Sequence, residues 1–281
     1  MKRTVIGVVA VLALAGATAA RAADMPLKAP PPVDVYSSWT GVYSGWEVGA
    51  KWTSDQWTAT CFSANGSGAN CGTAANPFFV DASSPQTLTT SGLRAGSYAG
   101  VNWQFSPQFV FGVEIDVAWY NQTATVNGLI GCTTFCGFLL PTAANIDSTS
   151  VHHRGDGSGR LRFGFLPRPD VMLYATGGGA VEAVQETETC SAAGPWCVTP
   201  RTQTNSQWLG GWTIGGGIEW KYGNNWIFRG EYRYAQFQTI DTNFFAGSVD
   251  YNRASIKDTT QIATLGLSYL FNWGGPVVAK Y

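Results

Sequence analysis

The sequence has little charge and only one long apolar run. Lys, Arg, Asp and Glu make up 12% of the 281 residues, and the formal net charge is -1. No basic patch stands out, so we expect no nucleic-acid partner. After the run near the N-terminus, glycine, tyrosine or charge interrupts every apolar stretch long before the roughly 20 residues of a membrane-spanning helix. These absences exclude a helical inner-membrane protein.

Motifs for phosphate or metal binding are also missing. The triple glycines at 177–179 and 215–217 lack the Lys-Ser/Thr pair of a phosphate loop, and neither opens a helix. Cys132 and Cys136 have no second ligand pair at zinc-site spacing. We therefore expect no metal ligand and no cofactor.

His152 and His153 are the only histidines, and Asp156 lies close by in the sequence. A catalytic base at the rim of a hydrolase would need a positioned nucleophile or water, and no motif marks one. We expect no catalytic residue. Our interpretation is that the two histidines are polar residues at an interface or an adventitious metal contact.

The first 22 residues are typical of a cleavable export signal. Lys2 and Arg3 form a positive start, an apolar run extends from Val5 to Ala20, and Ala20-Arg21-Ala22 offers a small-x-small cleavage site. The alternative is an uncleaved anchor, but the run is shorter than a spanning helix requires. We expect cleavage after Ala22, a proline-rich periplasmic lead-in over residues 23–38 and a folded unit over residues 39–281.

Aromatic residues, at 14%, and glycines, of which there are 34, are abundant. Many lie in segments with period-two alternation, the pattern of a β-strand. In Phe109–Trp119, the clearest segment, large apolar residues alternate with residues that include Glu114 and Asp116. The eight predicted strands are Val42–Trp52, Leu93–Phe105, Phe109–Trp119, Arg160–Phe165, Val171–Ala183, Trp208–Lys221, Phe228–Tyr234 and Leu265–Phe271.

The polar faces of these strands carry both signs of charge in nearly equal numbers. The charged residues are Glu47, Lys51, Arg94, Glu114, Asp116, Arg160, Arg162, Glu182, Glu219, Lys221, Arg229, Glu231 and Arg233. Because isolated buried charges would be prohibitive, we expect them to pair inside a narrow barrel as a lumen charge network. A soluble β-sandwich, the alternative, would bury its aromatic face. The sequence therefore predicts an all-β, eight-stranded antiparallel transmembrane β-barrel in the outer membrane.

The connections between the predicted strands alternate in length. Those after the second, fourth and sixth strands are short, and the others are long, as expected for short periplasmic turns and long extracellular loops. The first three long loops each hold two of the six cysteines. In an oxidising compartment, local pairing is the simplest connectivity, with free thiols or inter-loop bridges as alternatives. The predicted loop disulfides are Cys61 with Cys71, Cys132 with Cys136, and Cys190 with Cys197.

Several stretches together resemble a known family. They are Trp39-Thr-Gly41-x-Tyr43, Gly177-Gly178, Gly211-Trp-Thr-x-Gly-Gly-Gly217-Ile-Glu219 and the terminal Phe271-Asn-Trp-Gly-Gly-Pro-Val-Val-Ala-Lys-Tyr281. The chain resembles the alphaproteobacterial outer-membrane proteins of the porin-family, OmpA-like β-barrel type. The resemblance implies an abundant eight-stranded barrel that serves envelope integrity and surface exposure. The cysteine pairs are not a feature of that family.

An eight-stranded interior is just wide enough for side chains to fill it, which argues against a general diffusion pore. The leading hypothesis is a structural barrel that maintains the envelope and presents disulfide-stapled loops to a host or cell-surface ligand. A small-solute channel through the charged lumen is the alternative, followed by a rim hydrolase. Expected partners are outer-membrane lipid, lipopolysaccharide and the barrel-insertion machinery, which would recognise Tyr269, Phe271 or Tyr281 during assembly.

Overall fold

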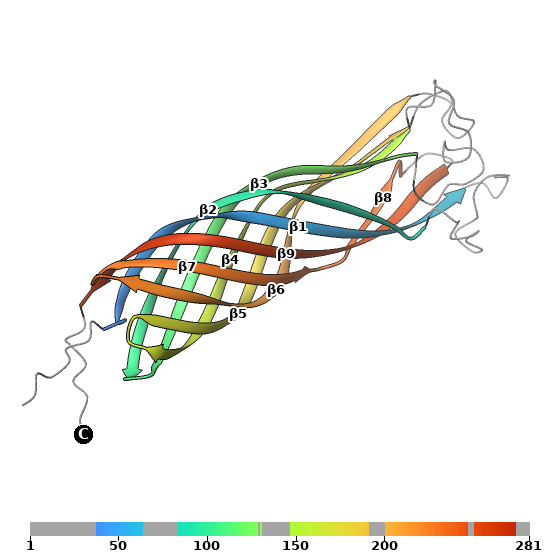
Figure 1. The fold of residues 1–281 in the computed structure, drawn as a ribbon. Coiled ribbons are helices and arrows are strands. Elements are labelled where there is room, and N and C mark those ends of the chain that lie inside the picture. The colour runs from blue at the N-terminus through green and yellow to red at the C-terminus, as the bar shows by residue number, and fades with distance from the viewer. Residues whose placement is uncertain are drawn as a thin grey trace, which may run out of the picture. The chain divides into compact units, whose positions relative to one another are not determined.

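The structure, a computed structural model, is an antiparallel β-barrel (Figure 1). It describes residues 38–63, 84–128, 130, 147–190, 200–246 and 250–273. The strands are β1 (Gly41–Ser63), β2 (Gln86–Ser106), β3 (Phe109–Asn127), β4 (Ser148–Arg168), β5 (Val171–Cys190), β6 (Arg201–Tyr222), β7 (Trp226–Phe237), β8 (Ile240–Phe244) and β9 (Asp250–Asn272). Neighbours pair in chain order from β1 to β7, then β9, and β9 pairs with β1. The sheet is therefore closed.

The barrel wall has eight strands because β8 continues β7 along the same edge of β9. β7 pairs with residues 259–269 of β9, and β8 pairs with residues 252–256. Only Gln238 and Thr239 separate β7 from β8. The predicted eight-stranded antiparallel barrel is confirmed.

Three tight turns lie at one end of the barrel. Pro107-Gln108 joins β2 to β3, Pro169-Asp170 joins β4 to β5, and residues 223–225 join β6 to β7. Gly223 has a φ of 63°, a left-handed conformation that glycine adopts at little cost. These are the predicted short periplasmic turns.

The strands are longer than the alternating segments predict. β1 continues to Ser63, β5 continues to Cys190, and β9 begins at Asp250. Cys61 and Cys190 therefore lie in strands, so their assignment to loops was wrong. The connection after the seventh strand is also shorter than predicted, because β8 occupies part of it. Outside the lipid band both faces of a strand can be polar, so the alternation of apolar and polar residues ends there. The backbone hydrogen bonds between the strands continue beyond that point, which makes the strands longer than the alternation predicts.

Some predictions fall outside the described residues. They concern the export signal, lead-in residues 23–37, Tyr281 and the four cysteines at 71, 132, 136 and 197. Cys190 is disulfide-bonded, and its pairing with Cys197 stays a prediction. Within the described ranges, no helix has the length and hydropathy needed to cross a bilayer.

The outer face of the barrel carries a band of exposed apolar side chains between two aromatic girdles. Its centre includes Val113, Ile115, Leu161 and Ile214. The lower girdle, nearer the tight turns, includes Trp103, Phe105, Phe163, Phe165, Trp220, Trp226, Phe228, Tyr269 and Phe271; the upper girdle includes Trp46, Trp52, Trp119 and Trp208. An apolar band between aromatic girdles is the lipid-facing surface of a transmembrane barrel.

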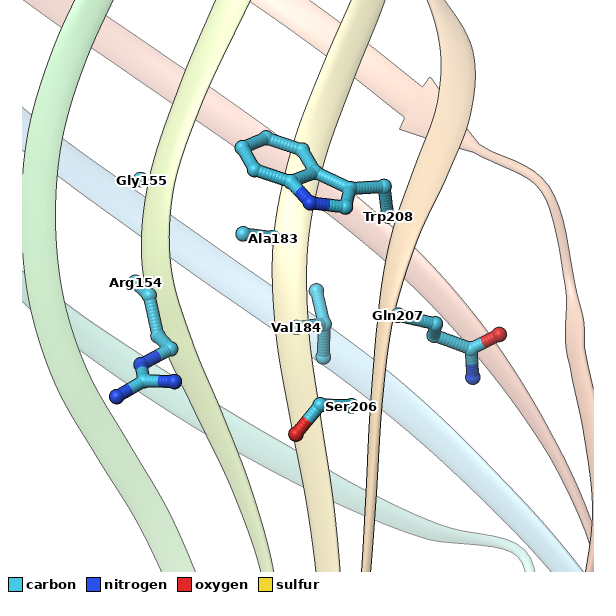
Figure 2. A pocket seen from close by; sticks show the side chains of 7 residues that line it. All are labelled: Arg154, Gly155, Ala183, Val184, Ser206, Gln207 and Trp208. Carbon is cyan, nitrogen blue, oxygen red and sulfur yellow. The ribbon is translucent and has the colours of Figure 1, made fainter.

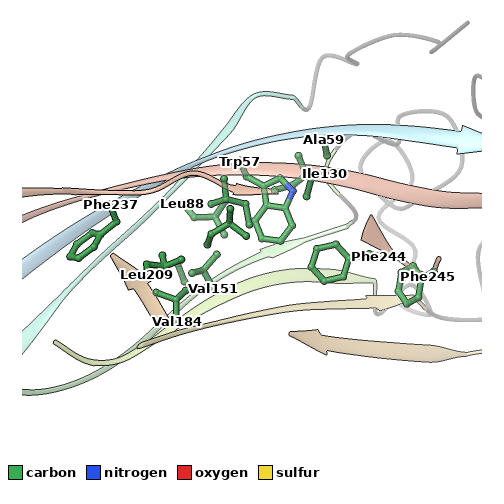
Figure 3. Close-up of a cluster of buried hydrophobic side chains, with 14 of the residues drawn as sticks. Trp57, Ala59, Leu88, Ile130, Val151, Val184, Leu209, Phe237, Phe244 and Phe245 are labelled. Carbon is green, nitrogen blue, oxygen red and sulfur yellow. The ribbon is translucent and has the colours of Figure 1, made fainter. Parts of the chain in front are cut away.

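Apolar side chains fill the interior near both ends. The periplasmic plug consists of Trp39, Tyr43, Tyr98, Val110, Leu166, Met172, Tyr174, Ile227 and Leu270. The larger extracellular plug (Figure 3) consists of Trp57, Ala59, Leu88, Ala124, Ile130, Val151, Ala180, Val184, Cys190, Leu209, Ala235, Phe237, Ile240, Phe244, Phe245, Ala254 and Ile256. The charged residues described below lie between these two plugs.

Candidate functional site

The charged residues predicted for the lumen network all have buried side chains inside the barrel. None is more than 5% exposed: Glu47, Lys51, Arg94, Glu114, Asp116, Arg160, Arg162, Glu182, Glu219, Lys221, Arg229, Glu231 and Arg233. Strand geometry explains this placement, because alternate residues of each strand point to the same face of the wall. Opposite charges meet both between neighbouring strands, as Glu114 and Arg160 do, and between strands that are not neighbours, as Glu114 and Arg229 do.

Glu114 of β3 is the acceptor at the centre of the lower half of the network. Its carboxylate receives Arg160 at 2.5 Å, Arg162 at 3.2 Å and Arg229 at 2.5 Å. The Tyr43 hydroxyl donates to the same carboxylate at 2.7 Å. Charge-assisted bonds of this kind are the strong ones, and together they offset the desolvation of four buried charges.

Arg94 of β2 organises the middle of the network. Its guanidinium contacts Glu47, and it reaches Asp116 at 2.6 Å and Asp156 at 2.7 Å. Arg233 approaches Asp116 from β7 at 2.9 Å. The sequence prediction missed Asp156 as a member of the network, because the predicted fourth strand began only at Arg160, whereas β4 begins at Ser148.

Lys51 and His153 continue the network towards the extracellular plug. The Lys51 ammonium lies 2.6 Å from Glu182 and 3.0 Å from Asp156. His153 contacts Glu182 through Nδ1 at 2.7 Å and Asp55 through Nε2 at 3.0 Å. Ion pairs and hydrogen bonds therefore follow one another along the lumen from Glu219, Glu114 and Asp116 up to Asp55.

The interpretation of the histidines as polar residues at an interface was wrong for His153, and the other interpretation, an adventitious metal contact, stays a prediction. Its side chain is 0% exposed inside the barrel, whereas His152 points outward and its Nε2 lies 2.6 Å from Asn121. A register shift between His153 and Gly155 changes the phase of β4, so that His153 and Asp156 both face the lumen. The alternation of apolar and polar residues in the sequence does not show where such a bulge lies.

Lys221 lies apart from the other lumen charges, at the periplasmic end. Its ammonium donates to the Ser38 carbonyl at 3.2 Å and lies 4.7 Å from the centre of the Trp39 ring. The indole N–H of Trp39 donates to the Pro169 carbonyl at 2.9 Å. The residues just before β1 therefore close the lower mouth of the barrel.

Arg154 is a cation on the outer wall of the barrel. It lines a crevice together with Gly155, Ala183, Val184, Ser206, Gln207 and Trp208 (Figure 2). A second crevice that also includes Arg154 is lined by Trp46 and Trp119. The guanidinium therefore lies beside the upper aromatic girdle, at the edge of the lipid band.

Glu186 and Glu188 are buried carboxyls above the lipid band, where the outward residues of β5 are polar. Glu186 accepts a hydrogen bond from Gln207 at 3.1 Å, and Glu188 accepts one from Asn252 at 2.8 Å. Burial raises the pKa of Glu188 well above its ordinary value and the pKa of Glu186 to about 7. Both carboxyls therefore keep their protons at a pH where an exposed glutamate has lost its own.

We expect the extracellular half of the barrel to lose stability as the pH rises from about 4.5 to about 7. In this window the unfolded chain releases the Glu186 proton while the folded chain keeps it, so the folded state binds more protons and its stability falls with pH. The loss from Glu186 should be on the order of 2 kcal/mol. Hydrogen exchange of the upper half of β5 at pH 5 and pH 8 measures it. Glu186→Gln should reduce the pH dependence, leaving the part due to Glu188, and exposed Asp241→Asn should not change it. Equal protection at both pH values in the unmodified protein would contradict the expectation.

The chain is similar to several known proteins. A family model described as an outer membrane protein beta-barrel domain matches residues 9–271. The 31 kDa outer-membrane immunogenic protein of Brucella melitensis is 26% identical over 279 residues, covering 94% of this chain and 98% of that protein. The 22 kDa outer membrane protein of Rhizobium leguminosarum bv. viciae is 28% identical over 170 residues, covering 60% and 64%. The solved structure of OprG from Pseudomonas aeruginosa aligns over 83% of this chain and 97% of its own, with 11% identity and a TM-score of 0.46.

Proposed function

Because the chain belongs to the outer membrane protein beta-barrel domain family, we propose that it is a structural protein of the outer membrane. Its closed barrel supports the envelope and holds surface loops, stapled by disulfides, on the outside of the cell. The observation that carries this proposal is the filled interior, in which paired charges lie between two apolar plugs. Such a filled lumen favours a structural barrel over a water-filled channel.

The alternative of a small-solute channel needs charged groups that water and ions can reach. Arg94 and Glu114 are both 0% exposed, and each is bound by several groups of opposite charge. Trp39 and Trp57, in the two plugs, are also 0% exposed. These features favour a barrel packed with side chains, as expected for eight strands.

The alternative of a rim hydrolase needs an imidazole that substrate can reach. His153 is 0% exposed, and both of its ring nitrogens contact carboxylates. His152 is directed outward and contacts the Asn121 side chain. Neither environment provides the nucleophile beside a base that catalysis requires, so we favour a non-enzymatic role.

A surface role is supported by the name of the Brucella relative, an outer-membrane immunogenic protein. The ends of the connection between β3 and β4 are held together, since the Gly128 amide donates to the Asp147 carbonyl at 2.7 Å. The base of this connection is therefore part of the barrel. The segment beyond it, which contains Cys132 and Cys136, is a candidate for recognition by a host or cell-surface ligand.

Lipopolysaccharide is the lipid partner that we propose for the outer wall. Arg154 places a positive charge beside Trp208 on one side and beside Trp46 and Trp119 on the other. Aromatic girdles lie at the level of the lipid headgroups, where a guanidinium can bind phosphate with two parallel hydrogen bonds. The insertion machinery remains the proposed partner during assembly.

The proposal predicts that the barrel and its loops have separable roles. Residues 132–145 would be replaced by a Gly-Asn-Gly turn, which removes Cys132 and Cys136 together and leaves Ile130 in the extracellular plug. We expect the shortened protein to fold, and to restore detergent resistance to cells that lack the gene. Whole-cell binding of antibodies raised against the folded protein should fall.

The matched control is Asp241→Asn, an exposed change on β8 that leaves the segment intact. It should restore detergent resistance and keep full antibody binding. If the shortened protein folds but fails to restore detergent resistance, the envelope role does not belong to the barrel. If antibody binding is unchanged by the replacement, this segment is not the presented surface.

A further inference from the structure

Four side chains of opposite walls meet inside the barrel, where the lumen network borders the extracellular plug. They are His153 of β4, Glu182 of β5, Asp258 of β9 and Asp55 of β1, and each is 0% exposed. One ligand atom each from His153, Glu182 and Asp258 lies within 4.8 Å of the other two. A group of this size and composition can surround a single cation.

Asp258 is the member of this cluster whose two carboxylate oxygens both lack a hydrogen-bond donor among the described residues. Within the same part of the chain, Glu182 Oε2 and Asp55 Oδ1 are also without a partner. A buried carboxylate without donors is costly, so an orphan of this kind requires an explanation. The free oxygens belong to the same three carboxylates that face His153.

Lys51, the lysine that interacts with Asp258, already forms ion pairs with two other carboxylates. The ammonium of Lys51 contacts Glu182 at 2.6 Å and Asp156 at 3.0 Å, which leaves Asp258 and Asp55 dependent on His153. The electrostatic neighbours of Asp258 are Glu182, Asp55, His153 and Lys51, so three carboxylates, Asp258 included, share two basic groups. The cluster is therefore short of positive charge at the point where its oxygens converge.

We propose that this cluster binds a divalent transition-metal ion, Zn²⁺ or Mn²⁺. The ligands are one ring nitrogen of His153 and carboxylate oxygens of Glu182 and Asp258. Asp55 accepts a hydrogen bond from the other ring nitrogen, which fixes the orientation of the imidazole, as second-shell carboxylates do at other metal sites. An imidazole together with carboxylates suits these ions better than Ca²⁺, which takes oxygen ligands.

The ligands come from three strands, so the ion would tie β9 to β4 and β5 above the lipid band. This is a structural role, because the site is buried and lies below an apolar plug. A buried site of this kind is loaded during folding, when the ligands are still accessible. The inference does not depend on the proposed envelope function.

The test is metal retention after folding. The full chain is refolded from metal-free denaturant into detergent with Zn²⁺, Mn²⁺, Ca²⁺ or no metal. Each sample is passed through a gel-filtration column in the presence of chelator. Mass spectrometry of the metal then measures how much metal the protein retains. We expect about one equivalent of Zn²⁺ or Mn²⁺ per folded barrel, little Ca²⁺, and a higher Tm than that of the metal-free sample. Asp258→Asn should lower retention by about tenfold or more.

Asp241→Asn, an exposed carboxylate change on β8, is the matched control and should retain the metal. Circular dichroism identifies samples that have folded, and His153→Gln serves as the second variant if Asp258→Asn does not fold. Folded wild type without metal would overturn the proposal. Equal metal retention in folded Asp258→Asn would also overturn it, because it would indicate adventitious binding. A Tm that Asp258→Asn raises both with and without metal would overturn it as well, because it would indicate that protons neutralise the cluster.

Discussion

Glu114→Gln should destabilise the folded barrel by about 3–5 kcal/mol, the usual cost of breaking a buried ion pair. The substitution keeps the shape of the side chain but removes the negative charge that faces three guanidinium groups. Arg160 and Arg229 would then lie buried with less compensation, since each contacts Glu114 at 2.5 Å. Unfolding by urea in lipid vesicles measures the change in the free energy of unfolding.

An exposed ion pair provides the control for this experiment. Arg168 and Asp170 are 3.4 Å apart with side chains 68% and 45% exposed, so Asp170→Asn should change stability by less than about 1 kcal/mol. The double variant Glu114→Gln, Arg229→Gln should cost less than the sum of the single changes, because the two groups interact directly. A Glu114→Gln protein as stable as the wild type would show that the network contributes no net stability.

Trp57→Ala should destabilise the extracellular half by about 3–5 kcal/mol, the range for removing a large buried aromatic side chain. Trp57 is 0% exposed and stacks on Phe244 with ring centroids 5.7 Å apart. Figure 3 shows its ring among Leu88, Ile130 and other side chains of the extracellular plug. The loss should be local, because Trp57 belongs to the extracellular plug, which is a separate cluster from the periplasmic plug.

Hydrogen exchange by residue distinguishes a local from a global effect. Protection should fall in β8 and in the upper part of β1, and it should persist near Glu114 in the lipid band. Trp57→Phe keeps an aromatic ring and should cause a smaller loss than Trp57→Ala. Unchanged protection of β8 in Trp57→Ala would contradict the view that this plug holds the extracellular half together.

The lipid-facing part of the fold could be predicted because the bilayer imposes a simple pattern there. Between Phe109 and Trp119, apolar side chains face lipid and polar ones face the lumen, so alternation marks the strand and its orientation. The charges at Glu114 and Asp116 could be assigned to the interior for the same reason. The tight turns were marked by proline, glycine and asparagine.

The extracellular half could not be predicted because the polarity of the inward and outward faces of its strands differs from that inside the lipid band. Trp57 points inward, so above the lipid band the rule of apolar outside and polar inside is reversed. Asp258 lies in the part of β9 that precedes the recognisable segment, and its role depends on residues distant in sequence. His153 was misplaced because a bulge in β4 changes the phase of the strand.

Single-channel conductance of the purified, folded protein in a planar bilayer tests the central claim most directly. The variant Glu114→Gln, Arg162→Gln removes one negative and one positive charge from the lumen and serves as the comparison. A filled, structural barrel predicts a quiet membrane for the wild type and no steady openings. Steady openings whose size or ion selectivity changes with the variant would contradict this account and establish a channel through the charged lumen.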